Sequence, residues 1–360
     1  MEPNDEKTRM IAEYHHQILR KLIVFVASIA GIILFVGLFS INSYPDLTLA
    51  ETYDIIWNHI IGNSFEPRTT YWWADRHIWN TAMPHIIVAI LAGVSLAVCG
   101  TLMQALMGNP LADPYSTGIS SGACFGAVAA IVMGAVLFGF SNQYGIVVNA
   151  FIGAMIPALL IIFLSSRIRM TPATLILLGT AISYFFNSLI TYMMVTTDAD
   201  TLKSAYMWQI GSLDGMSWES IPIMLVITIL GSIFVMFASN KLNVMSLGEN
   251  SAISLGIDVQ QFRTICLAVM AIMTSAIVAF TGIIGFVGLV SPHIVRILVG
   301  SDNKFVLPIS MSMGALLMLF ADYISFLLAN IPIGVVMSVI GSPIFLILII
   351  YHTRSKGVVY

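Results

Sequence analysis

Long apolar stretches recur along the whole chain, and they limit the possible folds more than any other feature of the sequence. A run of about 20 apolar residues is long enough to cross the roughly 30 Å of hydrocarbon in a bilayer. Ten such segments can be placed, at residues 22–40, 84–106, 115–138, 145–166, 172–195, 220–239, 262–282, 284–299, 306–328 and 333–352. Charged residues make up 9% of the chain, whereas soluble domains carry about 25%. The sequence therefore predicts an all-α integral membrane protein with ten transmembrane helices.

Two of these segments have features that a simple span lacks. Residues 22–40 follow a charged tail, but no small-residue cleavage site comes after them, so we interpret them as a retained first span rather than a signal peptide. Segment 284–299 is short and contains Gly285, Gly288 and Pro292. Irregular backbone inside a membrane is tolerated only against protein or a cavity, so we expect a broken helix there.

Positive charges predict how the spans are oriented. Only Arg68, Arg76 and Lys203 fall in outer segments when the N-terminus is placed inside the cell. The other twelve basic residues then fall in inner segments: Lys7, Arg9, Arg20, Lys21, Arg167, Arg169, Lys241, Arg263, Arg296, Lys304, Arg354 and Lys356. An excess of Lys and Arg is typical of cytoplasmic loops. We therefore expect both termini in the cytoplasm, with an N-terminal tail at 1–21, a ten-span domain at 22–352 and a C-terminal tail at 353–360.

Two outer segments are long. The stretch DLTLAETYDIIWNHIIG within residues 41–83 has helical periodicity, and the segment also contains Trp72, Trp73 and Trp79. These features indicate a helix at the membrane interface, where tryptophan is enriched. A surface for a soluble partner is the alternative. The second outer segment, 196–219, contains more acidic than basic residues.

Motifs for nucleotide binding and for several hydrolases are absent from the sequence. None of the six lysines is preceded by Gly, which excludes a P-loop, and neither H-E-x-x-H nor G-x-S-x-G occurs. Cys99, Cys124 and Cys266 lie in apolar segments without C-x-x-C spacing, as small buried residues do. The sequence therefore predicts no enzyme activity, no metal site and no cofactor bound by this chain.

Two spans carry polar residues at membrane depth. In the fifth, Gly179, Ser183, Asn187 and Thr191 follow at intervals of four, which places them on one face of a helix. Close helix packing through small residues is one interpretation of this stripe, and the wall of a water-accessible path is the other. In the ninth span, Asp322 is the only acidic residue in the middle of any span. An intramembrane carboxylate is a functional candidate, and capping or bonding a broken neighbouring helix is the alternative.

The inner segment 240–261 is too polar to span a membrane and too patterned for a simple connection. Its short amphipathic pieces are interrupted at Gly248 and Gly256, which predicts two small helices lying across the cytoplasmic face. A bare connection between two spans needs only a few residues, so the extra length suggests a docking surface. On these residues alone, a channel, a secondary transporter and the membrane half of an ATP-driven transporter all remain open.

Five motifs occur in order along the chain. They are G-x-x-L-A-x-x-G-x-x-x-Q-x-x-x-x-N-P-L-A-x-P, G-x-S-x-G-A, L-G-E-x-x-A-x-x-L-G, G-F-V-G-L-V-x-P-H-x-x-R, and P-x-G-V-V followed by G-x-P-x-F. They occupy Gly93–Pro114, Gly118–Ala123, Leu247–Gly256, Gly285–Arg296 and Pro332–Phe345. From about residue 80 to 352, the chain thus resembles the FecCD-type permeases, the membrane subunits of ABC importers for ferric siderophores, haem and cobalamin.

The resemblance implies a type II ABC importer permease fold with ten helices per subunit, located in the cell (plasma or inner) membrane. It also implies a homodimer with the pathway on its twofold axis, two separate ABC ATPase subunits that bind ATP and Mg, and an extracytoplasmic substrate-binding protein. No nucleic acid is implied. By the same resemblance, the translocation pathway is lined by Thr171, Pro172, Gly179, Ser183, Asn187 and Thr191, and the ATPase couples through Leu247, Gly248, Glu249, Ala252, Leu255 and Gly256.

The resemblance also places a turn between the second and third spans near the inner gate. Within it, Pro110 and Pro114 break the helix, and Asn109 and Asp113 can bond the exposed backbone groups of both ends. We therefore expect a structural role for this turn rather than a substrate site.

The chain departs from the family at three docking positions. Family members usually carry arginines that resemble contact points for the binding protein, whereas the matching positions here are Ala82, His85 and Phe326. We therefore predict that the binding protein docks through other outer residues, together with the Trp-rich outer segment. The candidates are Arg68, Arg76, His85 and Lys203.

The function expected from the resemblance is import of an iron(III)-siderophore-type chelate. Cobalamin or another corrinoid is the first alternative within the family, and haem is the second. An ion-coupled secondary transporter is the alternative of another class. It would need ionisable residues along its path, and Asp322 is nearly alone in the spans.

Overall fold

The computed structural model of the protein describes residues 3–42, 47–135, 137, 143–165, 167–168 and 170–356. These residues form helices and irregular connections, with no strand among them, which confirms the predicted all-α class. In chain order the elements are α1 (Pro3–Asn42), α2 (Leu49–Ile60), α3 (Thr70–His77), the π-helical η1 (Ile78–Ala82), α4 (Met83–Met107), η2 (Pro114–Thr117), α5 (Ile119–Met133), α6 (Gln143–Ser165), α7 (Pro172–Val195), α8 (Ala199–Ile210), η4 (Trp218–Ser220), α9 (Ile221–Met245), α10 (Glu249–Ser254), α11 (Val259–Thr281), α12 (Val287–Val299), α13 (Asn303–Leu327) and α14 (Ile333–Lys356). Part of each predicted tail, including residues 1–2 and 357–360, lies outside the described residues.

Within the described residues, eight helices are long and apolar enough to cross a membrane. They coincide with eight of the ten predicted spans and include α1, α4, α6, α7, α9, α11, α13 and α14. The other two predicted spans contain α5 and α12, with 15 and 13 residues, which extend roughly 20 Å at 1.5 Å per residue. Their predicted starts at 115 and 284 are too early, because left-handed backbone precedes each helix: φ is 82° at Gly118 and 68° at Phe286.

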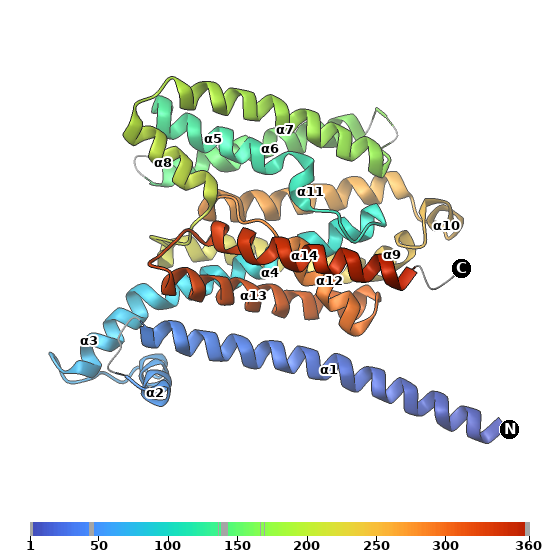
Figure 1. The fold of residues 1–360 in the computed structure, drawn as a ribbon, viewed down its shortest axis with the longest axis horizontal. Coiled ribbons are helices and arrows are strands. Elements are labelled where there is room, and N and C mark those ends of the chain that lie inside the picture. Colours follow the sequence, from blue (N-terminus) through green and yellow to red (C-terminus); the bar gives the residue numbers. More distant parts are fainter. Residues whose placement is uncertain are drawn as a thin grey trace.

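The long helices pack in groups that can be followed in Figure 1. Helices α5 to α8 form one group, α4, α9, α12, α13 and α14 form another, and α11 contacts both. The most buried long helix is α4, and glycines allow its neighbours to approach closely. A Cβ on Gly93 would lie 2.4 Å from the carbonyl oxygen of Gly314 in α13, and one on Gly100 would lie 1.6 Å from that of Gly288 in α12. Helix α1 lies at the edge and packs mainly on α13.

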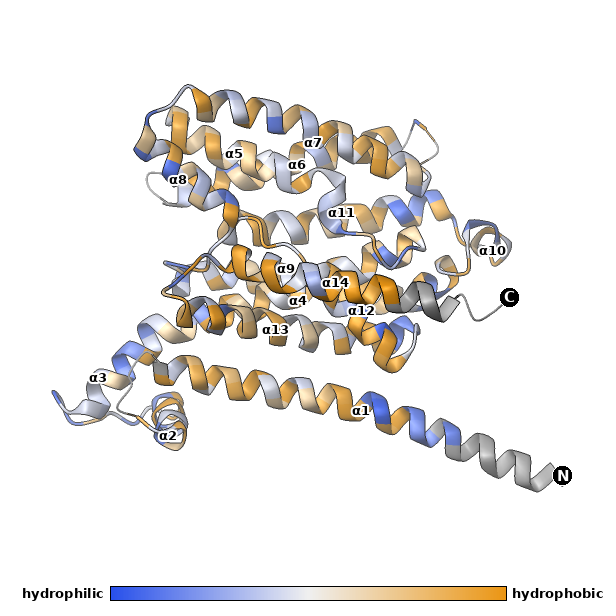
Figure 2. Ribbon diagram, in the orientation of Figure 1, coloured by the Kyte–Doolittle hydropathy of each residue, from blue (hydrophilic) through white to orange (hydrophobic). Residues whose placement is uncertain are grey.

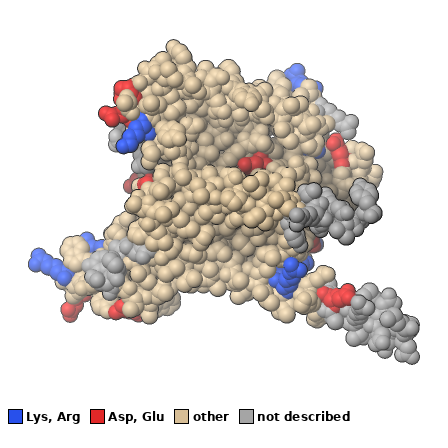
Figure 3. Space-filling model, viewed as in Figure 1, with Lys and Arg blue, Asp and Glu red and all other residues tan. Residues whose placement is uncertain are grey.

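The two ends of the bundle carry different elements. The start of α1, the end of α14 and the short helix α10 lie at one end, which we call the α10 end, whereas α2, α3 and α8 lie at the other, the α8 end (Figure 1). Hydrophobic residues cover the long helices between these ends (Figure 2). Charged side chains gather at the two ends, apart from an acidic patch in a hollow between them (Figure 3). A largely uncharged flank is the surface expected of a protein in a bilayer.

At the α8 end, part of segment 41–83 folds into α2, α3 and η1, which leads into α4. The periodicity of this segment predicts a helix, and α2 confirms it. A capping box between Thr48 and Glu51 closes the start of α2. The Nδ1 atom of His59 on α2 lies 2.6 Å from the Oδ1 atom of Asp75 on α3. The same imidazole ring stacks on the Trp79 ring, with centroids 4.0 Å apart. These contacts hold α2 against α3 at the mouth of the bundle.

Candidate functional site

The polar stripe of the fifth predicted span lies on α7, where Thr171 and Pro172 are half-buried and Gly179 is tightly packed. Thr171 caps the helix, because its side-chain oxygen accepts a hydrogen bond from the Thr174 N–H at 3.2 Å. Pro172 follows in the first turn, where its missing N–H costs nothing. Gly179 is buried, and a Cβ there would lie 1.9 Å from the carbonyl oxygen of Ser116. The close-packing interpretation therefore describes Gly179.

Beyond Gly179 the stripe opens onto the protein surface. Ser183 is half-buried, and Asn187 and Thr191 are exposed. Beside them, Tyr184 and Tyr192 expose 72% and 69% of their surface. The Thr191 hydroxyl donates to the Asn187 carbonyl oxygen at 2.8 Å, within α7 itself. This face exposes an amide and two phenol groups. It is therefore the part of α7 that we retain as the candidate lining of a path.

The turn after α4 is held by its own side chains. Gly108 ends α4 with φ 57°, a conformation that favours glycine. The Asn109 side-chain oxygen then accepts the Leu111 N–H at 3.0 Å, and the Asp113 carboxylate accepts the Tyr115 N–H at 3.1 Å. Burial raises the pKa of Asp113 to about 6, although the Tyr115 N–H opposes this shift. One short connection thus contains all four predicted turn residues: Asn109, Pro110, Asp113 and Pro114.

The same turn meets the irregular backbone between α11 and α12. The Tyr115 hydroxyl donates to the Ile284 carbonyl oxygen at 3.1 Å. A second segment, the connection after α8, bonds nearby: the Ser212 N–H donates to the Thr281 carbonyl oxygen at the end of α11 at 2.9 Å. The break predicted within 284–299 is present only at its start: residues 284–286 are not helical, whereas α12 runs through Gly288 and Pro292 without interruption. Tyr115 and Ile284 are 169 positions apart, and no local sequence pattern indicates that they meet.

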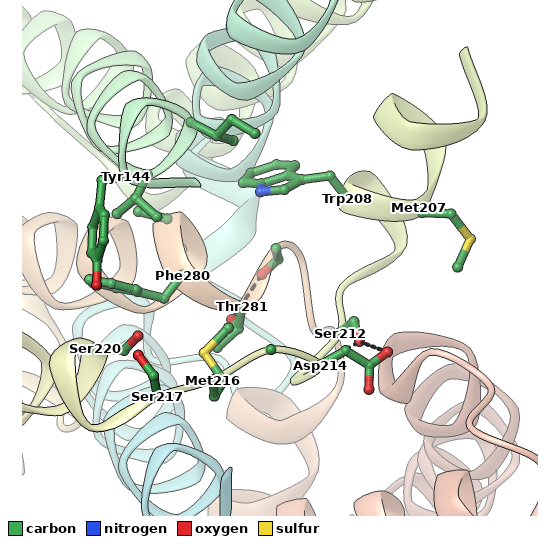
Figure 4. A pocket seen from close by; sticks show the side chains of 15 residues that line it. Tyr144, Met207, Trp208, Ser212, Asp214, Met216, Ser217, Ser220, Phe280 and Thr281 are labelled. Carbon is green, nitrogen blue, oxygen red and sulfur yellow. Dashed lines mark hydrogen bonds between the residues drawn. The ribbon is translucent and has the colours of Figure 1, made fainter. Parts of the chain in front are cut away.

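A cavity of about 290 Å³ opens at the α8 end (Figure 4). Tyr144 of α6 and Phe280 of α11 lie on one side, and Trp208 of α8 lies across from them. Met216, from the connection between α8 and α9, lies below, and Asp214 on the same connection is exposed. Among the described residues that line this cavity, none is Lys, Arg or His. Sequence reasoning missed the cavity; the only signal was the acidic character of segment 196–219.

At the opposite end, the structure corrects the prediction for segment 240–261. We predicted two short helices, but the structure has one, α10, because the first amphipathic piece continues α9 to Met245. Gly248 and Gly256 flank α10 with φ 105° and 81°, and these positive values favour glycine. The glycines therefore interrupt the chain where the pattern indicates, but only one of the two pieces is a separate helix.

The predicted coupling residues on and around α10 point in two directions. Leu247 and Leu255 expose 70% and 65% of their surface, whereas Ala252 is fully buried. The Glu249 carboxylate turns toward the body of the protein and lies 3.8 Å from the guanidinium of Arg263. Exposed leucines at an end that carries charged residues form an apolar surface that another protein can cover.

The predicted outer docking residues lie in two places at the α8 end. Arg68, in the connection between α2 and α3, is exposed. The Arg76 guanidinium lies over the Trp72 ring, 4.2 Å from its centroid. Lys203 is exposed on α8, and Figure 3 shows basic side chains both near α3 and near α8. These three cations face outward from the bundle and can meet a partner.

His85, the fourth predicted docking residue, faces inward. Its Nε2 atom lies 3.0 and 2.9 Å from the two carboxylate oxygens of Asp322, and its ring stacks on Phe39 of α1 with centroids 4.9 Å apart. The structure therefore does not support docking through His85, because α1 covers the ring. Asp322 is 4% exposed and bonds α4, an intact helix rather than a broken one. A structural role for Asp322 explains this geometry.

Known proteins resemble the chain over most of its length. A proposed ABC transporter permease of Methanocaldococcus jannaschii is 41% identical over 289 residues, which cover 76% of this chain and 81% of that protein. The cobalamin import system permease of Halobacterium salinarum is 35% identical, over 74% of this chain and 71% of its own. A solved structure, a proposed metal-chelate type ABC transporter in an inward-facing conformation, has a TM-score of 0.73 and 29% identity, and the match covers 86% of this chain and 100% of that one.

A family model matches residues 47–351, which run from just before α2 into α14. The match is longer than the motif resemblance, which starts near residue 80. Together with the eight long apolar helices of the described residues, the permease relatives make this a multi-pass protein of the cell membrane. The resemblance inferred from the five motifs is confirmed, and the chain belongs to the FecCD transport family.

Proposed function

We propose that this chain is the membrane-spanning permease subunit of an ATP-driven ABC importer, and that its cargo is a ferric chelate of the siderophore type. The observation that carries the proposal is the order of three surfaces along one bundle: the cavity at the α8 end, the exposed polar face of α7, and the projecting α10. An importer needs access, a path and a place where its motor acts, in this order. The likeness to a metal-chelate type transporter supports the choice of cargo.

In this proposal, two copies of the chain enclose the pathway. Each contributes ten spans, counting the short helices α5 and α12, and both termini lie in the cytoplasm. Exposed side chains on two helices support the pairing: Phe185 of α7 exposes 62% of its surface, and Val339 and Ile347 of α14 expose 67% and 65%. Asn187 is also exposed on α7. Its amide favours a water-filled path at this face over contact with lipid.

Partner proteins act at opposite ends of the bundle. Two ATPase subunits, which bind ATP and Mg, press on α10, since this chain contains no P-loop of its own. A substrate-binding protein delivers the cargo at the α8 end, where Arg68, Arg76 and Lys203 face outward. This separation lets ATP hydrolysis on one side of the membrane drive import from the other.

A corrinoid is the second candidate cargo. The 35% identity to a cobalamin import permease supports it, and the 36% identity to a hemin transport permease of Yersinia pestis supports haem to a similar degree. Ion-coupled secondary transport is less consistent with the site. Among the described residues of α7, none is charged, and Asp322 is bound to His85 rather than open to a path.

Uptake by intact cells tests the proposed function. Cells with and without this gene receive labelled ferric siderophore, cobalamin and haem in parallel. We expect the deletion to abolish ferric siderophore uptake and the restored gene to recover it. Loss of cobalamin uptake alone would transfer the proposal to the corrinoid candidate, and normal uptake of all three would refute it.

A variant of α10 ties this test to the structure. Leu247→Asp places a charge on the exposed apolar surface at the α10 end and should abolish uptake by weakening the contact with the ATPase. Leu19→Asp is a matched control, because Leu19 exposes 52% of its surface on α1, near the same end but away from α10. Equal effects of both variants at equal membrane abundance would contradict the role of α10.

A further inference from the structure

The first two turns of α11 hold the connection between α6 and α7. The Gln260 side-chain amide donates to the carbonyl oxygens of Ser165 and Ile168, the second at 3.2 Å. One turn later, the hydroxyls of Thr264 and Ser165 lie 3.0 Å apart. These bonds join the end of α6 and the connection after it to the start of α11, so a movement of α11 is passed on to the segment that leads into α7.

Arg263 lies between these contacts and reaches two segments at once. Its side chain is 3% exposed. One guanidinium nitrogen donates to the carbonyl oxygen of Met170, the residue before the Thr171 cap of α7, and the other lies 3.8 Å from the Glu249 carboxylate at the start of α10. A buried guanidinium needs such partners, because an unpaired charge in the interior is costly. Arg263 therefore connects α10 to the beginning of α7.

The backbone on either side of α10 is open. Gly248 and Gly256 have positive φ values, and apart from the adjacent residues of the chain nothing lies within 4 Å of a Cβ built on either residue. These unpacked turns provide little resistance to a movement of the short helix. Force on α10 therefore reaches the membrane helices through its side chains. Two of them point inward: the buried Ala252, and Glu249 with its partner Arg263.

We infer that Arg263 is a positioning residue that transmits movement of α10 to the inner end of α7, and thereby couples ATP hydrolysis to opening of the path. This inference rests on the proposed function, since it assigns a role within an ATP-driven importer. The route is Glu249, Arg263 and the Met170 carbonyl, with Gln260 and Thr264 holding the same connection. Loss of the guanidinium leaves an attached and active ATPase whose movement no longer reaches α7.

The first test compares Arg263→Gln, Arg263→Lys and Arg296→Gln in transporters reconstituted in vesicles with their ATPase and binding protein. Arg296 is a matched control, because its guanidinium binds the Ser301 carbonyl and the Asn303 side chain between α12 and α13. Arg263→Gln should lower the uptake per ATP hydrolysed about tenfold, a typical coupling between two sites, while hydrolysis is largely retained. Arg263→Lys should recover part of the coupling, because Lys keeps the charge without the fork of donors.

A second test needs no cargo. Ala173 in the first turn of α7 is exposed, and the three native cysteines are buried, so Ala173→Cys introduces one accessible thiol. Binding of ATP to the attached ATPase should change the rate at which a water-soluble maleimide modifies this thiol. The change should disappear when Arg263→Gln is added, and it should persist when Arg296→Gln is added.

Each outcome supports or overturns the inference. Unchanged uptake per ATP in Arg263→Gln, with an unchanged thiol response, would overturn it. Should Arg263→Gln fail to assemble, Gln260→Ala and Thr264→Val loosen the same connection more mildly, and normal coupling in both would also overturn it. Absence of ATP-driven uptake by the unmodified complex would instead refute the proposed function, so the two failures are distinguishable.

Discussion

His85 and Asp322 join two helices at the level of single residues. They face each other between α4 and α13, although 237 positions separate them in the sequence. Phe39 of α1 covers the histidine ring, and the Phe39 ring also contacts Phe326, with centroids 6.0 Å apart. Polar groups that are paired in a low-dielectric interior interact strongly, and either one alone is costly. His85 and Phe326 thus help to pack α1, α4 and α13 in this protein.

Removing one partner of this pair should destabilise the protein. Asp322→Ala and His85→Ala should each lower the free energy of unfolding by about 2 kcal/mol, because a buried polar group is left without its partner. The double variant should cost less than the sum of the two. Thermal unfolding of detergent-purified variants measures these effects. Strictly additive losses would show that the two side chains act independently.

Asp113 should make stability depend on pH. Its pKa is raised from 3.8 to about 6 by burial, so the folded protein binds the proton more tightly than the unfolded chain. This contribution favours the folded state below about pH 4 and is lost as the pH rises through about 6.

Asp113→Asn keeps an acceptor for the Tyr115 N–H and removes the charge. Its Tm should therefore exceed that of the unmodified protein at pH 7.5, and the difference should shrink at pH 5. Asp214→Asn, which changes an exposed carboxylate at the α8 end, is the control. A difference in Tm that is the same at both pH values would contradict the assignment to Asp113.

Single residues differ in how far the sequence can predict them. Asn109 and Asp113 could be assigned to a turn because side-chain bonds to backbone two residues away follow local chemistry. The bond between His85 and Asp322 could not be predicted, since it depends on the packing of α4 against α13. Arg263 was counted only as an inner positive charge, and its contact with Glu249 likewise required the fold.

At the level of elements, α7 combines packing and exposure along one helix. Its buried side packs on the turn after α4, where Gly179 meets the Ser116 carbonyl, while Asn187 and Thr191 lie open further along. Because the same stripe serves both purposes, periodicity alone could not choose between the two interpretations. The structure shows close packing at Gly179, and the path interpretation stays a prediction for the exposed part of the helix.

Substitutions along the α7 stripe should show this division. Gly179→Ala should lower the free energy of unfolding by about 1–3 kcal/mol, as expected for an overpacked site, because its Cβ would lie 1.9 Å from the Ser116 carbonyl oxygen. Ser183→Ala, one turn later and half-buried, is the matched control and should change stability little. Thermal unfolding provides the comparison, and equal Tm values for the two variants would contradict the packing role.

The sequence predicted the elements better than their limits. Every predicted span contains a helix, because a long apolar run has few other solutions in a membrane. The late starts of α5 and α12 were missed, since hydrophobicity does not report the left-handed backbone at Gly118 and Phe286. The second helix predicted in 240–261 was missed for a related reason: an amphipathic piece can simply extend α9.

For the whole molecule, the main property is that charged side chains of both signs lie mainly at the two ends of the bundle, away from the surface between them (Figure 3). On the face shown in Figure 3, the surface between the two ends is largely uncharged, and charged side chains gather at the α8 and α10 ends. The sequence predicted this arrangement through its distribution of Lys and Arg. The cavity at the α8 end could not be predicted, because α6, α8, the connection to α9, and α11 each contribute part of its wall.

The outer cations should govern binding of the substrate-binding protein. Arg68→Ala combined with Arg76→Ala should weaken its affinity and flatten the dependence of that affinity on salt, because complementary charges at an interface are screened by ions. Lys304→Ala, an exposed cation on the first turn of α13 at the α10 end, is the control. A titration at several salt concentrations measures the effect, and unchanged affinity at all of them would contradict this docking surface.

The position of α1 has a consequence for how the protein is made. Ser28 of α1 donates to the Ser312 hydroxyl of α13 at 2.6 Å, across 284 positions of sequence. Ribosomes add about 5–20 residues per second, so α1 waits on the order of 15 to 60 seconds before its partner helix has been synthesised. During that interval it must remain in the lipid without a protein neighbour on that side. The most apolar 18-residue stretch of α1 has a mean hydropathy of 2.9, the highest such value among the long apolar helices of the described residues, which suits this period in the lipid without a protein neighbour.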